Sequence, residues 1–181
     1  LDKLRDVMEI NFVAQIHMMQ LVSKVMMRQK SGSIINMGSV GGIEAREGSS
    51  VSIGNDTKTN NVTINAVATN ENASDDWVIG VFSRHDGSSV DIKGDTVTIN
   101  ATATGTNMAS GILANTMDVN GVAKLDIDAN NIVITANAKE DGNAAAITTM
   151  SGSKTTIKGN LTANGDRAIY TRGDAKTYIN A

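Results

Sequence analysis

The sequence predicts a mainly β protein: a three-sided right-handed parallel β-helix (solenoid) preceded by a long α-helix and a short strand. Three observations favour this fold class. Six of the nine methionines lie in the first 37 residues, whereas the chain after residue 50 is rich in Asn, Thr, Asp, Ala and Gly. Beyond residue 50, short strand patterns recur in a fixed order. The chain also has no proline and only 3% aromatic residues, so its core must be built from aliphatic side chains.

Composition excludes several classes of function. The 181 residues carry 16 basic and 19 acidic side chains, a net charge of −3, which leaves no basic surface for nucleic acid. The absence of cysteine excludes disulfide scaffolds, cysteine–zinc clusters and thiol catalysis. No apolar run approaches the roughly 20 residues that cross a bilayer. Because the chain starts at Leu1 without a signal peptide, we expect it to be a piece of a longer protein.

Residues 2–30 predict one long amphipathic helix. Apolar side chains recur at spacings of three, four or seven residues, as on one face of a helix. Asp2 and Asp6 lie where the helix dipole favours anions, and Arg28 and Lys30 lie where it favours cations. Residues 33–37 (SIINM) then predict a short buried strand, followed by a loop over residues 38–42 (GSVGG).

This segment resembles part of the short-chain dehydrogenase/reductase family. The matching text is VMEINF at residues 7–12 and GSIINMGSVGG at residues 32–42. The resemblance covers residues 1–48 and implies that Asn11 and Ser39 occupy two positions of the family's catalytic tetrad. The family's Tyr-x-x-x-Lys, due about 13 residues after the serine, is replaced by residues 52–56 (SIGND), and no glycine-rich dinucleotide loop precedes the helix. We therefore expect no catalytic residue, no bound cofactor and no metal in this chain.

Three strand patterns repeat in the same order after residue 50. The first ends at Ile53, Ile92, Ile127, Ile157 and Ile179, in steps of 39, 35, 30 and 22 residues. The second is centred on Thr63, Thr98, Val133 and Thr162, and the third places a small residue before an aliphatic one: Gly80-Val81, Gly111-Ile112, Ala146-Ile147 and Ala168-Ile169. Strands this short cannot fold alone, but stacked coils pair their backbones and align their aliphatic side chains in columns.

The residues around these strands fit the same geometry. Asn65, Asn100 and Asn164 follow the second strand, where their side chains could stack as a ladder. The small residue of the third pattern suits a tight corner. A β-sandwich is the rival fold, because regularly spaced short strands also indicate that architecture.

Residues 50–181 resemble the passenger region of bacterial autotransporters in composition and repeat rhythm. This resemblance implies export to a cell surface or to the extracellular medium, in a structural or adhesion role. The dehydrogenase-like residues 1–49 would by themselves suggest the cytoplasm. We expect a non-enzymatic structural or binding module, and the alternative is an incomplete NAD(P)-dependent oxidoreductase fragment.

Several other residues could suggest chemistry, and each has a plainer interpretation. His17 and His85 are too far apart in sequence for a convincing metal site. Acidic and amide residues at 126–131 could suggest calcium, but solvated corners explain them better. Asp75 and Asp76 beside Trp77 could resemble a glycosidase carboxylate pair, or simply precede a strand with a buried tryptophan. A β-helix enzyme acting on polysaccharide would need carboxylates clustered on one face.

Partner contacts are expected in two places. Loops 67–76, 102–108 and 137–143 join the second strand to the third in successive coils, so we expect them to form one ridge. Either this ridge contacts a cell-surface protein or glycan, or the loops vary freely and bind no ligand. The N-terminal helix is expected to cap the first coil near Val51 and Ile53, or to self-associate through its methionine stripe. No contact with nucleic acid and no membrane span is expected.

Overall fold

The computed structural model describes residues 41–68, 77–104, 108–118, 120–139 and 144–180, together with His17, Leu21, Lys24 and Arg28. The chain divides into two compact units, Leu1–Asn36 and Met37–Ala181. The four isolated positions have helical backbone conformation. The rest of the predicted helix, the strand at residues 33–37 and the predicted cap lie outside the described residues.

The second unit is mainly β and consists of two all-parallel sheets. The first sheet has the order β1-β4-β6-β8-β10, with strands β1 (Gly41–Ala45), β4 (Trp77–Arg84), β6 (Met108–Asn115), β8 (Ala144–Met150) and β10 (Arg167–Arg172). The second has the order β11-β9-β7-β5-β2, with β3 also paired to β5. Its strands are β2 (Ser50–Ile53), β3 (Val62–Ala68), β5 (Ser89–Ala103), β7 (Lys124–Asn137), β9 (Lys154–Asn164) and β11 (Lys176–Asn180).

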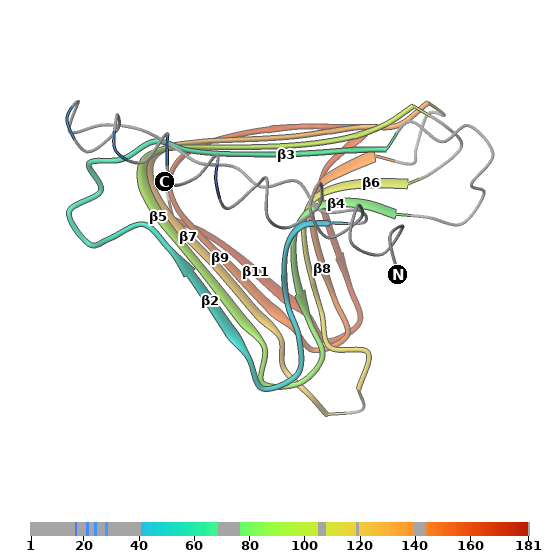
Figure 1. Cartoon of the computed structure of the whole chain (residues 1–181). Coiled ribbons are helices and arrows are strands. Elements are labelled where there is room, and N and C mark those ends of the chain that lie inside the picture. Colours follow the sequence, from blue (N-terminus) through green and yellow to red (C-terminus); the bar gives the residue numbers. More distant parts are fainter. Residues whose placement is uncertain are drawn as a thin grey trace, which may run out of the picture. The chain divides into compact units, whose positions relative to one another are not determined.

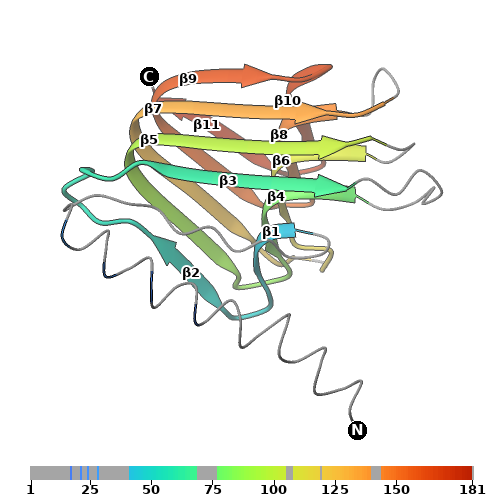
Figure 2. The same ribbon diagram turned by 45° about the horizontal axis from the view of Figure 1, so that its top comes forward.

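Strands of the two sheets alternate along the chain, which gives a solenoid-like stack of coils. Figure 1 looks down the axis of the stack, and Figure 2 shows the coils lying one above another. β2 and β3 pair with successive parts of β5, at Ser89–Ile92 and Val97–Ala103. Each of β5, β7 and β9 therefore runs through both the first and the second predicted strand of its coil and bends between them (Figure 1).

The predicted columns are confirmed by the strand register. Ile64 pairs with Ile99, and Ile99 pairs with Ile134, so these three side chains lie on neighbouring rungs. The first pattern aligns Ile53, Ile92, Ile127, Ile157 and Ile179. The third aligns Val81, Ile112, Ile147 and Ile169. A β-sandwich is excluded for the described part of this unit because every strand pair there is parallel.

The interior contains two separate apolar clusters. The larger is built from the three columns and includes Val81, Ile92, Ile99, Ile112 and Ile134, each fully buried. The smaller consists of alanines from β3, β5, β6, β7 and β8 together with Val78. It lies where the ends of β3, β5 and β7 run beside the beginnings of β4, β6 and β8, as a two-layer extension at one corner (Figure 1). Alanine lets these two layers approach closely.

Strand β1 begins before the boundary expected near residue 50. Gly41 and Gly42 were expected in a loop, but they belong to β1, where Gly41 pairs with Ile79 and Ile43 pairs with Val81. The physical reason is that Gly42-Ile43 follows the rule of the third pattern, a small residue before an inward aliphatic one. The solenoid-like stack therefore has one rung more than the sequence predicts.

The Asn ladder is present in its first two rungs. Asn100 Nδ2 donates a hydrogen bond of 2.8 Å to Asn65 Oδ1. Thr135 occupies the next rung and separates Asn100 from Asn164, so the predicted ladder of three asparagines is interrupted.

Candidate functional site

The predicted ridge of loops leaves one edge of the stack. The last residues of β3 and β5, Ala68 and Ala103, pair with each other, and so do the first residues of β4 and β6, Trp77 and Met108. The connections between these strands therefore start and return at adjacent rungs. Residues 69–76, 105–107 and 140–143, which form most of the three loops, lie outside the described residues.

A concave angle lies beside this edge of the stack. Strands β4, β6 and β8 run along the two-layer extension and then bend (Figure 1). The pairing between these strands is interrupted at Gly80, Gly111 and Ala146, where the bend lies. Two outward-facing columns meet across this bend. One contains Ile79, Ser110, Ala145 and Arg167, and the other contains Phe82, Leu113, Thr148 and Tyr170.

Half of the outer side chains at this bend are buried, namely Ile79, Ser110, Leu113 and Thr148, which is unusual for an outer face of a solenoid. Leu113 alternates with the inward Ile112 and Ala114, yet only 3% of its surface is exposed. Ser110 and Thr148 belong to different columns and adjacent strands, and Ser110 Oγ donates a hydrogen bond of 2.9 Å to Thr148 Oγ1. The bend therefore brings the two columns into contact and forms an angle with a buried floor.

This angle opens into a cavity of about 210 Å³, which we call the elbow groove. Its lining includes Trp77 and Met108 at the loop end, Thr148 on the floor, and Arg167, Tyr170 and Arg172 from β10. The guanidinium of Arg167 lies over the ring of Tyr170, 5.1 Å from its centre. Arg167 and Arg172 are exposed, whereas Trp77 and Tyr170 are half-buried. The groove thus combines two aromatic rings with two cations.

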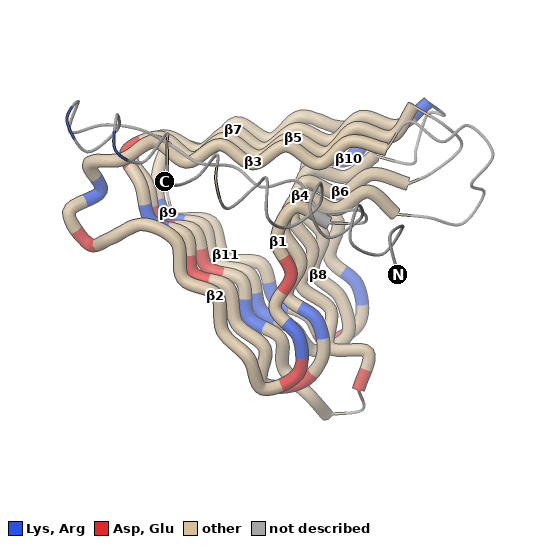
Figure 3. Tube along the Cα trace, viewed as in Figure 1, with Lys and Arg blue, Asp and Glu red and all other residues tan. Residues whose placement is uncertain are grey.

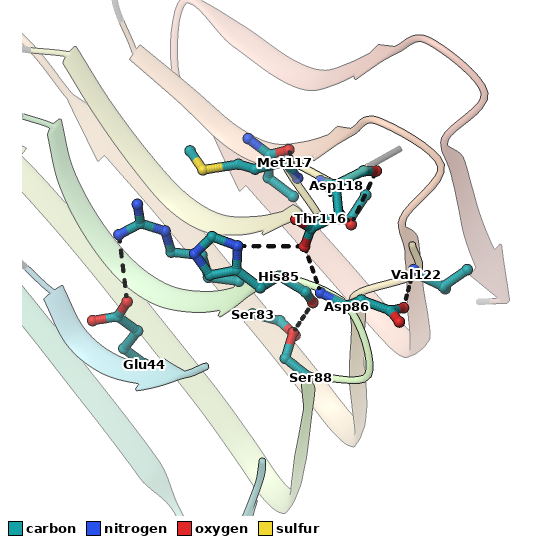
Figure 4. Close-up of polar contacts among 11 residues, drawn as sticks. Glu44, Ser83, His85, Asp86, Ser88, Thr116, Met117, Asp118 and Val122 are labelled. Atoms are coloured by element: carbon teal, nitrogen blue, oxygen red, sulfur yellow. Dashed lines mark hydrogen bonds and ion pairs between the residues drawn. The ribbon is translucent and has the colours of Figure 1, made fainter. Parts of the chain in front are cut away.

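A polar cluster occupies the opposite corner, where the chain turns from the first sheet into the second (Figure 4). His85 has a left-handed backbone in this turn, with φ of 70°, and its Nδ1 lies 3.4 Å from Asp118 Oδ2. The same carboxylate oxygen accepts a hydrogen bond of 3.1 Å from the Asp86 backbone N–H. Asp86 Oδ1 in turn accepts one of 2.8 Å from the Val122 N–H. These contacts tie the longer turn after β6 to the preceding coil.

The cluster lacks the geometry of a catalytic triad, although it contains serine, histidine and aspartate. Ser88 Oγ donates to the backbone carbonyl of His85, at 2.8 Å, and lies 2.9 Å from Ser83 Oγ (Figure 4). A nucleophilic serine must instead bond the imidazole ring. The cluster borders an open groove of about 790 Å³ whose lining includes Asp118, Asp174, Lys154, Lys176 and Tyr178. We interpret these residues as a structural turn with a mixed-charge surface.

Charged residues on the outer face of the second sheet are also stacked in rows (Figure 3). Lys124, Lys154 and Lys176 share one column, and Asp91 and Asp126 share the next outward column. The opposite charges of these neighbouring columns limit the repulsion between like charges within each column.

The acidic residues considered for calcium are distributed among other partners. Asp128 forms an ion pair with Lys58, which belongs to the loop between β2 and β3. Asn130 Nδ2 donates a hydrogen bond of 2.8 Å to Asp95 Oδ1. Within the described part of the chain, no group of three or more His, Cys, Asp or Glu side chains could hold a metal ion.

Most of the other candidate residues from the sequence lie outside the described part of the chain. Asp75, Asp76, Asn11 and Ser39 lie outside the described residues, and His17 is exposed. Among the residues that the structure describes, no helix has the length and apolar character needed to span a membrane. Sequence reasoning missed Arg167, Tyr170 and Arg172. Alternation with the inward Ile169 marks Tyr170 and Arg172 as outward, whereas Arg167 precedes the bend and has the parity of Ile169, so no sequence signal identified it.

Comparison with known proteins gives one partial match. A family model described as short chain dehydrogenase matches residues 1–52, less than a third of the chain. No curated protein and no solved structure matches the chain. The match extends into β1 and β2, whose residues pair in parallel with β4 and β5. Part of the dehydrogenase-like text therefore forms the first described strands of the solenoid-like stack.

Proposed function

We propose that this chain is a non-enzymatic structural and binding module from a surface-exposed, autotransporter-like passenger, with an adhesive role. The observation that supports it best is the unbroken stacking of aliphatic columns from Ile53 to Ile179. Such stacking places stability in the interior and leaves the outer faces free for contact. The composition, rich in Asn and Thr and free of cysteine, agrees with this class of protein.

The proposed architecture is a three-sided right-handed parallel β-helix. Three sides follow if the second sheet is divided at the bend in β5, β7 and β9, because β2 and β3 then belong to different faces. A right-handed path is expected because crossovers between parallel strands of one sheet are right-handed in about 98% of cases. The proposed location is the cell surface or the extracellular medium.

Adhesion can be tested with beads coated with the full chain. We expect saturable binding to extracellular matrix or to glycosylated cell surfaces, and loss of binding after heat denaturation. Equal retention of beads that carry native chain, denatured chain or albumin would overturn the adhesive role.

The alternative function is that of an incomplete NAD(P)-dependent oxidoreductase fragment. The family match over residues 1–52 favours it. Calorimetric titration of the full chain with NADH and NADPH separates the two proposals. The module proposal predicts no binding heat, and micromolar affinity for either nucleotide would favour the oxidoreductase fragment instead.

A further inference from the structure

We infer that the elbow groove binds a sugar ring that carries a carboxylate, such as a uronic acid residue. The inference assigns a class of ligand to a surface that the stacking of the strands does not explain. It rests on the shape and charge of the groove, so its failure would leave the structural module proposal standing.

Charge complementarity indicates an anionic ligand. Two of the residues that line the groove are arginines, and no described lining residue is acidic. Among the described residues, neither Arg167 nor Arg172 has a carboxylate within salt-bridge distance. Asp166, the neighbour of Arg167, uses Oδ2 to accept a hydrogen bond of 2.9 Å from the Ala144 N–H. Arginine's planar fork of donors matches a carboxylate in a bidentate manner.

The size and lining of the groove suit a single sugar ring. A volume of about 210 Å³ is below the range of about 300–1,000 Å³ of pockets for drug-sized ligands. Trp77 and Met108 supply an apolar surface at one end, and Tyr170 supplies a ring beside the arginines. A pyranose has an apolar C–H face that can pack on an aromatic ring, and the carboxylate of an acidic pyranose can then reach the guanidinium groups.

The larger groove at the opposite corner does not offer the same complementarity. Its lining contains Asp118 and Asp174 as well as Lys154 and Lys176, so an anion there would meet both signs of charge.

The test uses the full chain with D-glucuronate as the probe and D-glucose as the neutral probe of matched shape. Trp77 is the only tryptophan, so its fluorescence reports on the groove without labelling. We expect a saturable change with glucuronate at millimolar concentration and at least tenfold weaker binding of glucose. Calorimetry provides a second measurement of both affinities.

Variants separate recognition by the groove from general attraction of anions. Arg167→Gln and Arg172→Gln should each weaken glucuronate binding by about tenfold, the loss of one charge-assisted hydrogen bond. Arg46→Gln is the matched control, because Arg46 is exposed and lies in the turn after β1, outside the groove. It should leave the affinity unchanged. Circular dichroism of each variant checks that the fold is retained.

Four outcomes would overturn the inference. These are equal binding of glucose and glucuronate, no saturable signal in either measurement, an Arg46→Gln loss as large as that of the groove variants, or tighter binding of a glutamate-containing peptide than of glucuronate. The last outcome would identify the groove as a site for acidic peptides.

Discussion

A methyl group placed on Gly80 in β4 would lie 2.6 Å from Cγ2 of Ile99 in β5, the next strand along the chain. It would also lie 2.5 Å from the carbonyl oxygen of Gly111. Glycine is therefore required at this position by the close approach of the bend to the isoleucine column. The same relationship joins Gly42 to Ile64, at 2.8 Å, and Gly111 to Ile134.

The residue at the bend and the residue of the second column that faces it both change at the next rung. Ala163 replaces isoleucine opposite Ile134, and Ala146 occupies the rung after Gly111. A smaller residue in the second column thus accompanies a larger one at the bend. Ala163 has no Cγ2 that could meet a Cβ at the bend, so close packing allows alanine instead of glycine at position 146.

Gly80→Ala tests this steric relationship. We expect a loss of about 1–3 kcal/mol in the free energy of unfolding, the usual cost of overpacking. Chemical denaturation followed by circular dichroism would measure it. The same substitution should cost at least about 1 kcal/mol less in an Ile99→Ala background, because the clash with Cγ2 is then removed. Equal costs in both backgrounds would contradict the pairing of these two residues.

Ile134 and Val133 form a matched pair for the orientation of the second column. Ile134 is fully buried, whereas its neighbour Val133 faces outward and is half-buried. Ile134→Ala should cost about 2–5 kcal/mol in the free energy of unfolding, through lost burial and the cavity left behind. Val133→Ala should cost less than about 1 kcal/mol. Urea titration of both variants checks the difference, and similar losses would place the two side chains in equivalent environments.

Asp56 and Lys93 form an exposed pair with a predictable pH response. Lys93 Nζ donates a hydrogen bond of 2.6 Å to Asp56 Oδ1. This bond and the charge of Lys93 hold the pKa of Asp56 below its ordinary value of 3.8. The pair should therefore stabilise the fold above that pH and lose its effect as pH falls through the lowered pKa. An NMR titration of Asp56 in the native chain and in Lys93→Met should show the pKa rise toward 3.8 in the variant.

The pKa of Lys93 is raised, first through the same hydrogen bond to Asp56 and then through the charge of Asp91. Its stabilising effect should be complete below the ordinary lysine pKa and should disappear as pH rises through the raised value. Asp56→Asn should lower the Lys93 pKa but leave part of the shift, since Asp91 remains. An unchanged Lys93 titration in that variant would contradict the contact.

Removal of residues 1–36 tests whether the first unit caps the stack. Among the described residues, β1, β2 and β3 each pair with a strand on one side only. Unpaired strand edges favour association with other chains. We expect the shortened chain, which keeps β1, to have a lower Tm and to self-associate in analytical ultracentrifugation. A monomer with the Tm of the full chain would contradict a capping role.

The strand register was accessible from sequence because a parallel stack repeats its side-chain environment at every rung. The shared pattern Val-x-Ile at residues 51–53 and 90–92 predicts that these two segments pair with each other, as they do. The same alignment places Asn65 beside Asn100 and Thr135 in the next rung, so the interruption of the ladder could be read from the sequence, although the prediction considered only the asparagines. Gly42-Ile43 follows the third pattern, yet its place within dehydrogenase-like text led to the prediction of a loop instead of β1.

The elbow groove could not be predicted, because it depends on the angle at which the strands bend. Sequence alternation shows that Leu113 and Tyr170 point away from the core, but it carries no information on whether an outward side chain faces water or another outward column. Packing of Gly80 against Ile99 and of alanines in the smaller core folds the extension back, and only then do Ser110 and Thr148 meet.

The amino-acid sequence alone therefore determined the parallel stack, its three columns and the small residues at the bend, since each is a local pattern repeated along one dimension. Only the tertiary structure decided which outward residues gather into a groove and where its cations lie. Those features arise because the bend brings residues that are distant in sequence, such as Trp77 and Arg167, to the lining of one cavity.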